Sequence, residues 1–229
     1  MITDGLQGFV LHKRWSGDTS ARVTFFTREK GLFNALSKGG RAPKKQSLLQ
    51  PFTPLWLSID TRGEWHYLRQ LDVISPSLVL TGDALFSGLY LNELIYHGLY
   101  QHDPSPSLYD AYTQTMQALT QAVSRQDIEK ILRRFEWYFL SSAGYEFSLT
   151  HEAATHQPIL KDCFYDFIAG EGMVLATKGL SGQSILALAN NELDDPMVLK
   201  AAKWIMRRAI DHALGGKRIK ARELYTHSI

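Results

Sequence analysis

The chain of 229 residues contains a single cysteine, Cys163, and has no apolar run long enough to cross a bilayer. One thiol can form neither an internal disulfide nor a cysteine-rich zinc site, so the fold must depend on its apolar core. Residues 1–5 lack the basic and apolar segments that mark a signal peptide. We therefore expect a cytoplasmic protein without a membrane anchor.

Motifs of the common enzyme classes are also missing. The sequence has no glycine-rich phosphate loop, no dinucleotide fingerprint and no His-Glu-x-x-His pair. His151, His156 and Cys163 are close in sequence, but their spacing matches no common zinc site, and exposed histidines with a buried thiol explain them as well. We expect no enzyme activity, no cofactor and no bound metal.

Charge is unevenly distributed along the chain. Residues 1–50 carry nine basic and three acidic side chains, a net charge of +6, so the remainder sums to −4 of the total +2. This excess of positive charge in residues 1–50 favours a polyanionic partner. A solvated surface that only keeps the protein soluble would have the same composition.

The first 80 residues show the pattern of short strands joined by tight turns. Residues 21–27 and 52–60 alternate with period two, which is typical of half-buried strands. Further strands are predicted over 8–14, 32–37 and 65–69. Five short strands within about 75 residues predict a small closed barrel, most commonly of the oligonucleotide-binding (OB) type, although three- or four-stranded barrels of other families are also compatible. The glycine- and lysine-rich segment 38–46 is predicted to be an exposed, mobile loop.

The remainder of the chain is predicted to be mainly helical. Residues 83–100 form a helix that is apolar nearly all round and is capped by Asp83, and we expect both parts of the chain to pack on it. Glu93 in this helix is expected to pair with a cation or to cap a backbone amide. Other helices are predicted over 108–123, from a cap at Asp127 to Gly144, over 181–189, and from a cap at Asp195 to His212. Residues 145–178 are predicted to be irregular, with a small hairpin made by 164–168 and 173–176. The fold class is therefore α+β, with a barrel domain over 1–80 and a helical domain over 81–229.

Residues suited to single-stranded nucleic acid concentrate in the barrel segment. Such strands are bound by cations, which contact phosphates, and by aromatic rings, which stack on bases. Trp15 precedes a turn and is the aromatic residue that we expect to be exposed. The cations predicted to hold the DNA backbone are Arg14, Arg22, Arg28, Lys38, Arg41, Lys44 and Lys45.

A second binding surface is suggested on the last long helix. Lys200, Lys203 and Arg207 share one face of this helix and lie near Trp204. Cations beside an aromatic ring can hold a short acidic and aromatic peptide. A solvated helix face is an equally good interpretation of the same residues.

Seven short segments, in order along nearly the whole chain, resemble the RecO family of bacterial recombination mediators. They are Gly8–Leu11, Val23–Thr27 with Gly31, Lys38–Gly39, Leu49–Leu55, Tyr90–Leu94, Arg133–Glu136 with Gly144–Tyr145, and Gly215–Lys217 with Lys220–Leu224. The resemblance implies an OB barrel followed by a helical domain, binding of single- and double-stranded DNA, and annealing of complementary strands. It also implies that the protein acts near the nucleoid and helps to replace the single-strand-binding protein SSB by RecA, together with RecR and with RecF as a further candidate.

The resemblance further implies that the acidic C-terminal tail of SSB is a partner. For this tail we predict a site made by Arg133, Lys203, Trp204 and Arg207. Many relatives carry four zinc cysteines after the position of Gly144, whereas this chain has only Cys163 there and is similar to the zinc-free branch. Three alternatives stay open: a general RNA- or single-strand-binding barrel, a protein-docking scaffold without annealing activity, and an unrecognised hydrolase, for which the sequence shows no acidic cluster.

Overall fold

A computed structural model describes residues 2–227, with the side chains of residues 3, 4, 226 and 227 excepted. The chain forms two compact units. The first comprises the residues up to Ala122 together with those from Ile219 onward, and the second is Val123–Arg218. This division differs from the predicted boundary after residue 80.

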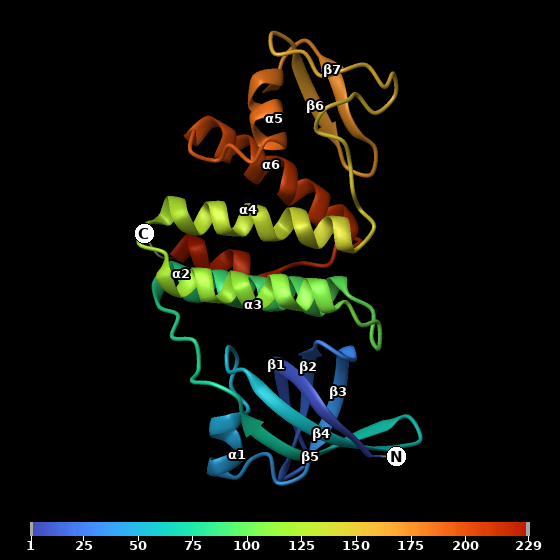
Figure 1. Ribbon diagram of the computed structural model, residues 1–229, viewed down its shortest axis with the longest axis vertical. Helices are drawn as coiled ribbons and strands as arrows, with labels where there is room; N and C mark the ends of the chain where they lie inside the picture. Colours follow the sequence, from blue (N-terminus) through green and yellow to red (C-terminus); the bar gives the residue numbers. More distant parts are fainter. Residues whose placement is uncertain (1, 228–229) are drawn as a thin grey trace. The chain divides into compact units, whose positions relative to one another are not determined.

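The N-terminal strands close into a five-stranded barrel (Figure 1). Its strands are β1 (Ile2–Ser16), β2 (Ser20–Thr27), β3 (Gly31–Ser37), β4 (Leu55–Arg62) and β5 (Trp65–Val73). They follow the order β1-β2-β3-β5-β4, and β4 pairs with β1 to complete the ring. All pairs are antiparallel except β3 with β5. The predicted five-stranded OB-type barrel is confirmed.

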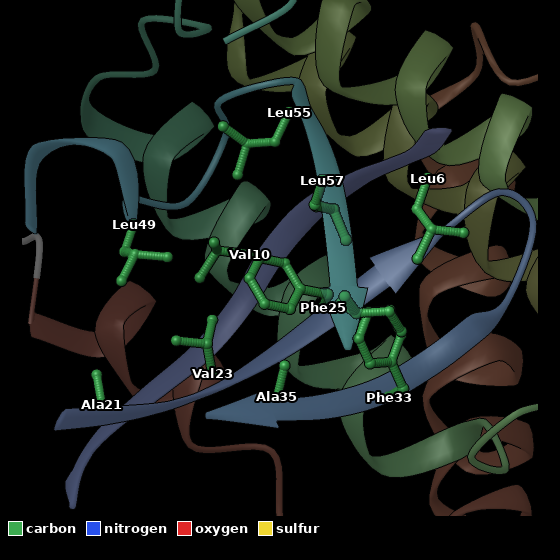
Figure 2. Packing of buried hydrophobic residues seen from close by; sticks show 11 residues of the cluster. Leu6, Val10, Ala21, Val23, Phe25, Phe33, Ala35, Leu49, Leu55 and Leu57 are labelled. Carbon is green, nitrogen blue, oxygen red and sulfur yellow. The ribbon is translucent and has the colours of Figure 1, made fainter. Parts of the chain in front are cut away.

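Alternation along the strands fills the barrel and determines what lies outside it. Val23 and Phe25 of β2, Phe33 of β3 and Leu57 of β4 are fully buried and point into one core cluster (Figure 2). Because successive side chains of a strand point to opposite faces, Arg22 between two core residues must point outward.

The basic segment after β3 is a turn followed by a short helix, α1 (Pro43–Leu48). Proline is tolerated at the first helical position because its missing amide would have no partner there. No residue of α1 is buried, but Leu49 directly after it is fully buried in the barrel core. The predicted irregular loop is therefore wrong over its second half, since the apolar anchor lies just beyond the predicted segment.

Two helices pack on the outside of the barrel, α2 (Gly82–Gly98) and α3 (Pro106–Gln121). Phe9 and Phe26 point outward but are buried, since they lie under Tyr109 and Tyr112 of α3 with ring centroids 5.1–5.8 Å apart. This aromatic layer explains why α3 belongs to the same compact unit as the barrel.

The central helix α2 differs from its prediction at its start and agrees at Glu93. The N-cap position is Thr81, so Asp83 lies in the first turn and the predicted cap is wrong. Glu93 accepts hydrogen bonds from the backbone amides of Lys220 (3.0 Å) and Ala221 (2.8 Å). The predicted capping of a backbone amide is confirmed, and it holds the start of the C-terminal 3-10 helix η1 (Lys220–His227).

The second unit contains α4 (Arg125–Ser142), α5 (Gly182–Ala189) and α6 (Pro196–Ala213). Its small sheet has the order β7-β6-β8, with β6 (Phe164–Ile168), β7 (Gly172–Ala176) and β8 (Leu180–Ser181). The predicted hairpin is confirmed, whereas β8 was not predicted, because two residues are too few to show a period. None of the helices in residues 2–227 is long and apolar enough to cross a membrane.

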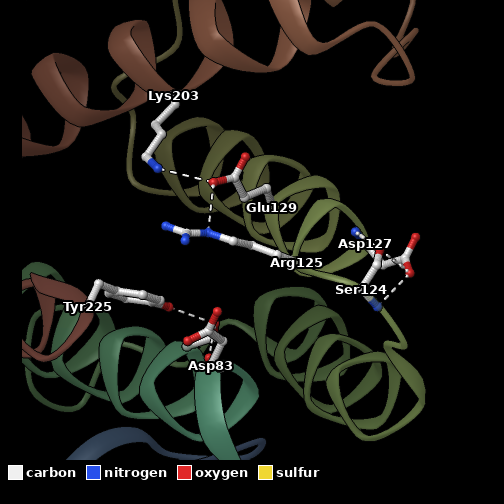
Figure 3. Close-up of polar contacts among 8 residues, drawn as sticks. Asp83, Ser124, Arg125, Asp127, Glu129, Lys203 and Tyr225 are labelled. Carbon is white, nitrogen blue, oxygen red and sulfur yellow. Dashed lines mark hydrogen bonds and ion pairs between the residues drawn. The ribbon is translucent and has the colours of Figure 1, made fainter. Parts of the chain in front are cut away.

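The helix caps of this unit follow local chemistry. Asp195 accepts from the amide of Met197 (2.7 Å), which confirms its predicted role at the start of α6. At α4 the N-cap is Ser124 rather than Asp127: the two side chains each bond the other residue's backbone amide at 3.1 Å (Figure 3). Asp127 therefore supports the cap from the third helical position.

Candidate nucleic-acid interface

Two arginines face each other on the outer surface of the barrel. Arg14 of β1 lies directly opposite Arg22 of β2 in the strand register. A bulge between Val10 and His12 shifts the register of β1, so Val10 points into the core while His12 lies opposite the outward-facing Thr24. The bulge thus brings His12 and Arg14 to the same outer face as Arg22.

Aromatic rings of β5 lie beside these cations. The guanidinium of Arg22 lies 5.1 Å from the centroid of the Trp65 ring. The ring of Tyr67 is contacted by Lys38 at 5.4 Å and by Arg62 at 5.6 Å. Trp65 is 54% exposed, so much of this indole is open to a ligand. The surface therefore alternates positive charge with aromatic faces, as single-strand binding requires.

A further cation–aromatic cluster occupies one end of the barrel. The ring of Trp15 is 46% exposed, as expected from its place before a turn, and lies 5.1 Å from Arg41 and 5.5 Å from Lys13. Lys13 donates to the carbonyl of Leu49 (2.9 Å), and partial burial lowers the pKa of its ammonium group.

The predicted lysines of the basic segment lie together and face solvent. Lys45 donates from Nζ to the carbonyl of Lys38 (2.7 Å), which ties α1 to the end of β3. Lys44 is exposed on the same short helix, and Arg41 is exposed in the turn before it. The structure thus places Lys38, Arg41, Lys44 and Lys45 within one turn and one helix.

Arg28 is separated from the other predicted DNA contacts. It lies six residues from Arg22, about 20 Å along the strand direction, in the turn directly after β2. Its guanidinium makes two 3.0 Å hydrogen bonds to the carboxylate of Asp110, one from Nε and one from Nη2. This hydrogen-bonded ion pair lowers the pKa of Asp110. A cation already neutralised by a carboxylate attracts a phosphate less strongly than the unpaired arginines do.

In the second unit, Arg133 lines a cavity of about 450 Å³ between α4, α5 and α6. Arg133 is buried and donates from Nη2 to Glu136 (2.7 Å). Apolar side chains such as Trp137, Leu188 and Met206 form much of the wall, and Arg134 adds a second cation. The cavity can therefore accommodate an apolar group next to a carboxylate. Arg134 and Trp137 were missed as site residues, although Arg134 follows the predicted Arg133 directly and Trp137 lies about one helical turn after it.

The four residues predicted to bind the SSB tail do not converge on this cavity. Lys203 on α6 binds Glu129 (3.1 Å), as Figure 3 shows, and Arg207 is exposed one helical turn further on. Trp204 stacks instead on the guanidinium of Arg208 at 4.0 Å. The α6 residue that lines the cavity beside Arg133 is Met206.

Two family models match the chain and together span nearly all of it. Residues 1–77 match "Recombination protein O N terminal" and residues 80–223 match "Recombination protein O C terminal". A DNA repair protein RecO from Legionella pneumophila (strain Lens) is 52% identical over 226 residues, covering 98% of this chain and 99% of the relative. The RecO proteins of Pseudoalteromonas atlantica (38% identical; 98% and 95% covered) and Pseudomonas putida strain W619 (40% identical; 96% of both) are also similar.

Proposed function

This chain belongs to the recombination protein O family of DNA repair proteins, and from that premise we propose that it binds single- and double-stranded DNA and anneals complementary strands. In this proposal it also helps RecR to replace SSB by RecA. RecR, RecF and RecA as partners rest on the family alone, whereas DNA and the SSB tail are also supported by features of the two units.

The observation that carries the DNA proposal is a set of cations that share one region of the barrel unit. In the described part of the chain none of them forms an ion pair with a carboxylate. The set comprises Arg14, Arg22, Lys38, Arg41, Lys44 and Lys45. Unpaired cations retain their full attraction for phosphate and release counterions on binding.

The same chemistry accounts for annealing. Two single strands repel each other because each carries one negative charge per nucleotide. Cations that neutralise phosphates on both strands lower this repulsion and raise the local concentration of complementary bases. The protein needs no cofactor for this, because base pairing supplies the driving force.

The salt dependence of DNA binding tests whether the cations of residues 38–45 contact the phosphates. The variant Lys38/Arg41/Lys44/Lys45→Ala is titrated with labelled single-stranded DNA across a range of salt concentrations. Each lost phosphate contact should lower the slope of log K against log salt by about 0.7, so four lost contacts would lower it by up to about 2.8. Arg28→Gln is the control, since its charge is paired with Asp110, and its slope should stay near that of the wild type. An unchanged slope in the quadruple variant would exclude the segment from the interface.

For the SSB tail, the cavity beside Arg133 supports the proposal better than the exposed face of α6. Its apolar wall suits an aromatic side chain, and the exposed Arg134 can contact a carboxylate. Arg133 is already paired with Glu136, so it lines the site without adding a free charge. We expect Arg134→Glu to weaken binding of the tail peptide at least about tenfold, since it places a like charge near the peptide carboxylates. Lys203→Glu with Arg207→Glu is the matched control on α6. If only the control variant loses the peptide, the site lies on α6 instead.

Strand annealing is tested directly with complementary oligonucleotides coated with SSB. The wild-type protein should accelerate annealing when SSB carries its tail, and less so when the tail is deleted. No acceleration in either case would contradict the annealing proposal and favour a docking scaffold.

A further inference from the structure

Two small cavities flank Arg22 on the outer face of the barrel. The first, of about 100 Å³, is lined by His12, Arg14, Arg22, Thr24, Asn34 and Tyr96. The second, of about 90 Å³, lies on the other side of Arg22, where Trp65, His66 and His102 are part of its wall. Arg22 and Asn34 line both, so the two cavities are neighbouring parts of one groove.

The first cavity has the chemistry of a phosphate site. Like charges directly opposite each other in a sheet are destabilising, yet Arg14 and Arg22 face each other, and no carboxylate lines the cavity. Thr24 donates its hydroxyl hydrogen to Oδ1 of Asn34 (2.6 Å), which leaves the Asn34 amide nitrogen as a donor. An anion bound here would relieve the repulsion between the arginines and accept from both.

The second cavity suits a base rather than a phosphate. Glu64 is part of its wall and would repel a phosphate. Burial lowers the pKa of His66 and of His102, and the nearby charge of Lys30 lowers both further, so the two imidazoles are neutral at pH 7. Their rings lie 5.1 Å apart, and beside them the indole of Trp65 is backed by Arg22 and 54% exposed. An exposed indole backed by a cation is a favourable stacking surface for a nucleobase.

We propose that this groove holds one unpaired nucleotide, with its phosphate between Arg14 and Arg22 and its base stacked on Trp65. The inference rests on the proposed DNA binding and deepens it, because it names the unit that is recognised. A base inside a duplex cannot reach the ring without unpairing. The groove therefore gives the barrel a preference for single strands, which the lysines of the basic segment cannot supply.

The stacking step is tested with Trp65→Leu, which removes the aromatic face but no charge. We expect this variant to lose about 5- to 100-fold in affinity for single-stranded DNA, while its affinity for a duplex of equal length and its salt slope change little. Tyr100→Leu, an exposed aromatic of the same unit, is the control and should bind as the wild type does. A strand of abasic sites should bind wild type and Trp65→Leu equally well, since neither complex can stack.

Binding of the phosphate between the two arginines is tested with Arg14→Gln. Arg69→Gln is the control, because it removes the same charge from β5 outside both cavities. Only Arg14→Gln should lower the salt slope for single strands, by about 0.7. The inference is overturned if Trp65→Leu weakens single strands and duplexes equally, or if the abasic strand still distinguishes the two proteins. If the folded wild-type protein binds no DNA at low salt, the proposed function itself fails, which is a different result from either.

Discussion

Replacing Glu93 by alanine should release the start of the C-terminal helix η1 from α2. The Glu93 carboxylate accepts from the amides of Lys220 and Ala221 at 3.0 and 2.8 Å, and its side chain is only 20% exposed. The alanine variant loses both acceptors and leaves two amides without their partner. At the other end of the contact, the hydroxyls of Tyr225 and Ser87 lie 2.6 Å apart and stay bonded, so the opening should be confined to the first turn of η1.

The magnitude follows from the two hydrogen bonds. A hydrogen bond to a charged group contributes about 1.5–3 kcal/mol, so two contribute about 3–6 kcal/mol before rehydration. The amide of Lys220 is exposed and regains water, whereas that of Ala221 is partly buried. We therefore expect the free energy of local opening to fall by about 2–3 kcal/mol. Glu93→Gln keeps one carbonyl acceptor and should lose about 1 kcal/mol.

Hydrogen exchange of the backbone amides is the suitable measurement, because it reports local opening residue by residue. A loss of 2–3 kcal/mol corresponds to exchange about 30- to 150-fold faster at Ala221. Glu146→Ala removes the same charge from an exposed site in the other unit and should leave these amides unchanged. If Ala221 in Glu93→Ala exchanges as slowly as in the wild type, the buried Ile219 and Ala221 side chains hold η1 without the carboxylate, and the reasoning is refuted.

Three further results are expected. His66 and His102 have pKa values below their ordinary 6.5, so the unfolded chain binds more protons than the folded chain just below pH 6.5. The free energy of unfolding, followed by thermal melting, should therefore fall as the pH is lowered from 7 to 5. In His66→Gln it should fall less steeply. Gly31→Ala should destabilise the barrel unit by about 3 kcal/mol or more, since Gly31 has φ +65° and an added Cβ would lie 2.2 Å from the Asp103 carbonyl oxygen; an unchanged melting temperature would contradict this. Ser124→Ala should lower the free energy of unfolding of the second unit by about 1 kcal/mol, because it removes the N-cap of α4. Urea denaturation measures this loss, and Ser142→Ala at the other end of the same helix is the control.

The elements were largely predictable from the sequence because their patterns are local. Period-two alternation in residues 21–27 identified β2, and the apolar spacing after residue 125 identified α4. The exact caps were less predictable. Asp83 and Asp127 each had the right chemistry, but Thr81 and Ser124 occupy the N-cap positions, and helix ends are the least certain part of any pattern.

The candidate sites were predictable only in part. The concentration of cations before residue 50 indicated a polyanion, but the contribution of Trp65 and Tyr67 depends on β5 lying beside β3, which is the one parallel pair of the barrel. In the second unit the sequence placed Lys203 and Arg207 on one helix face. Whether that face lines a cavity depends on the rotation of α6 about its axis. In the structure Met206 lines the cavity, and Lys203 and Arg207 do not.

The sequence by itself determined the strands of the barrel, the helices of the second half and the excess of positive charge in the first fifty residues, because each depends on residues close together in the chain. The family followed from the order of short motifs along nearly the whole chain. Tertiary structure alone decided which cations stay available. Arg22 and Arg28 were both predicted to contact DNA, yet folding brings Asp110, 82 residues away, to Arg28 and a second arginine to Arg22. The reason is physical: whether a charge is neutralised depends on what lies within a few ångströms of it, and for these residues only the packed chain sets that distance.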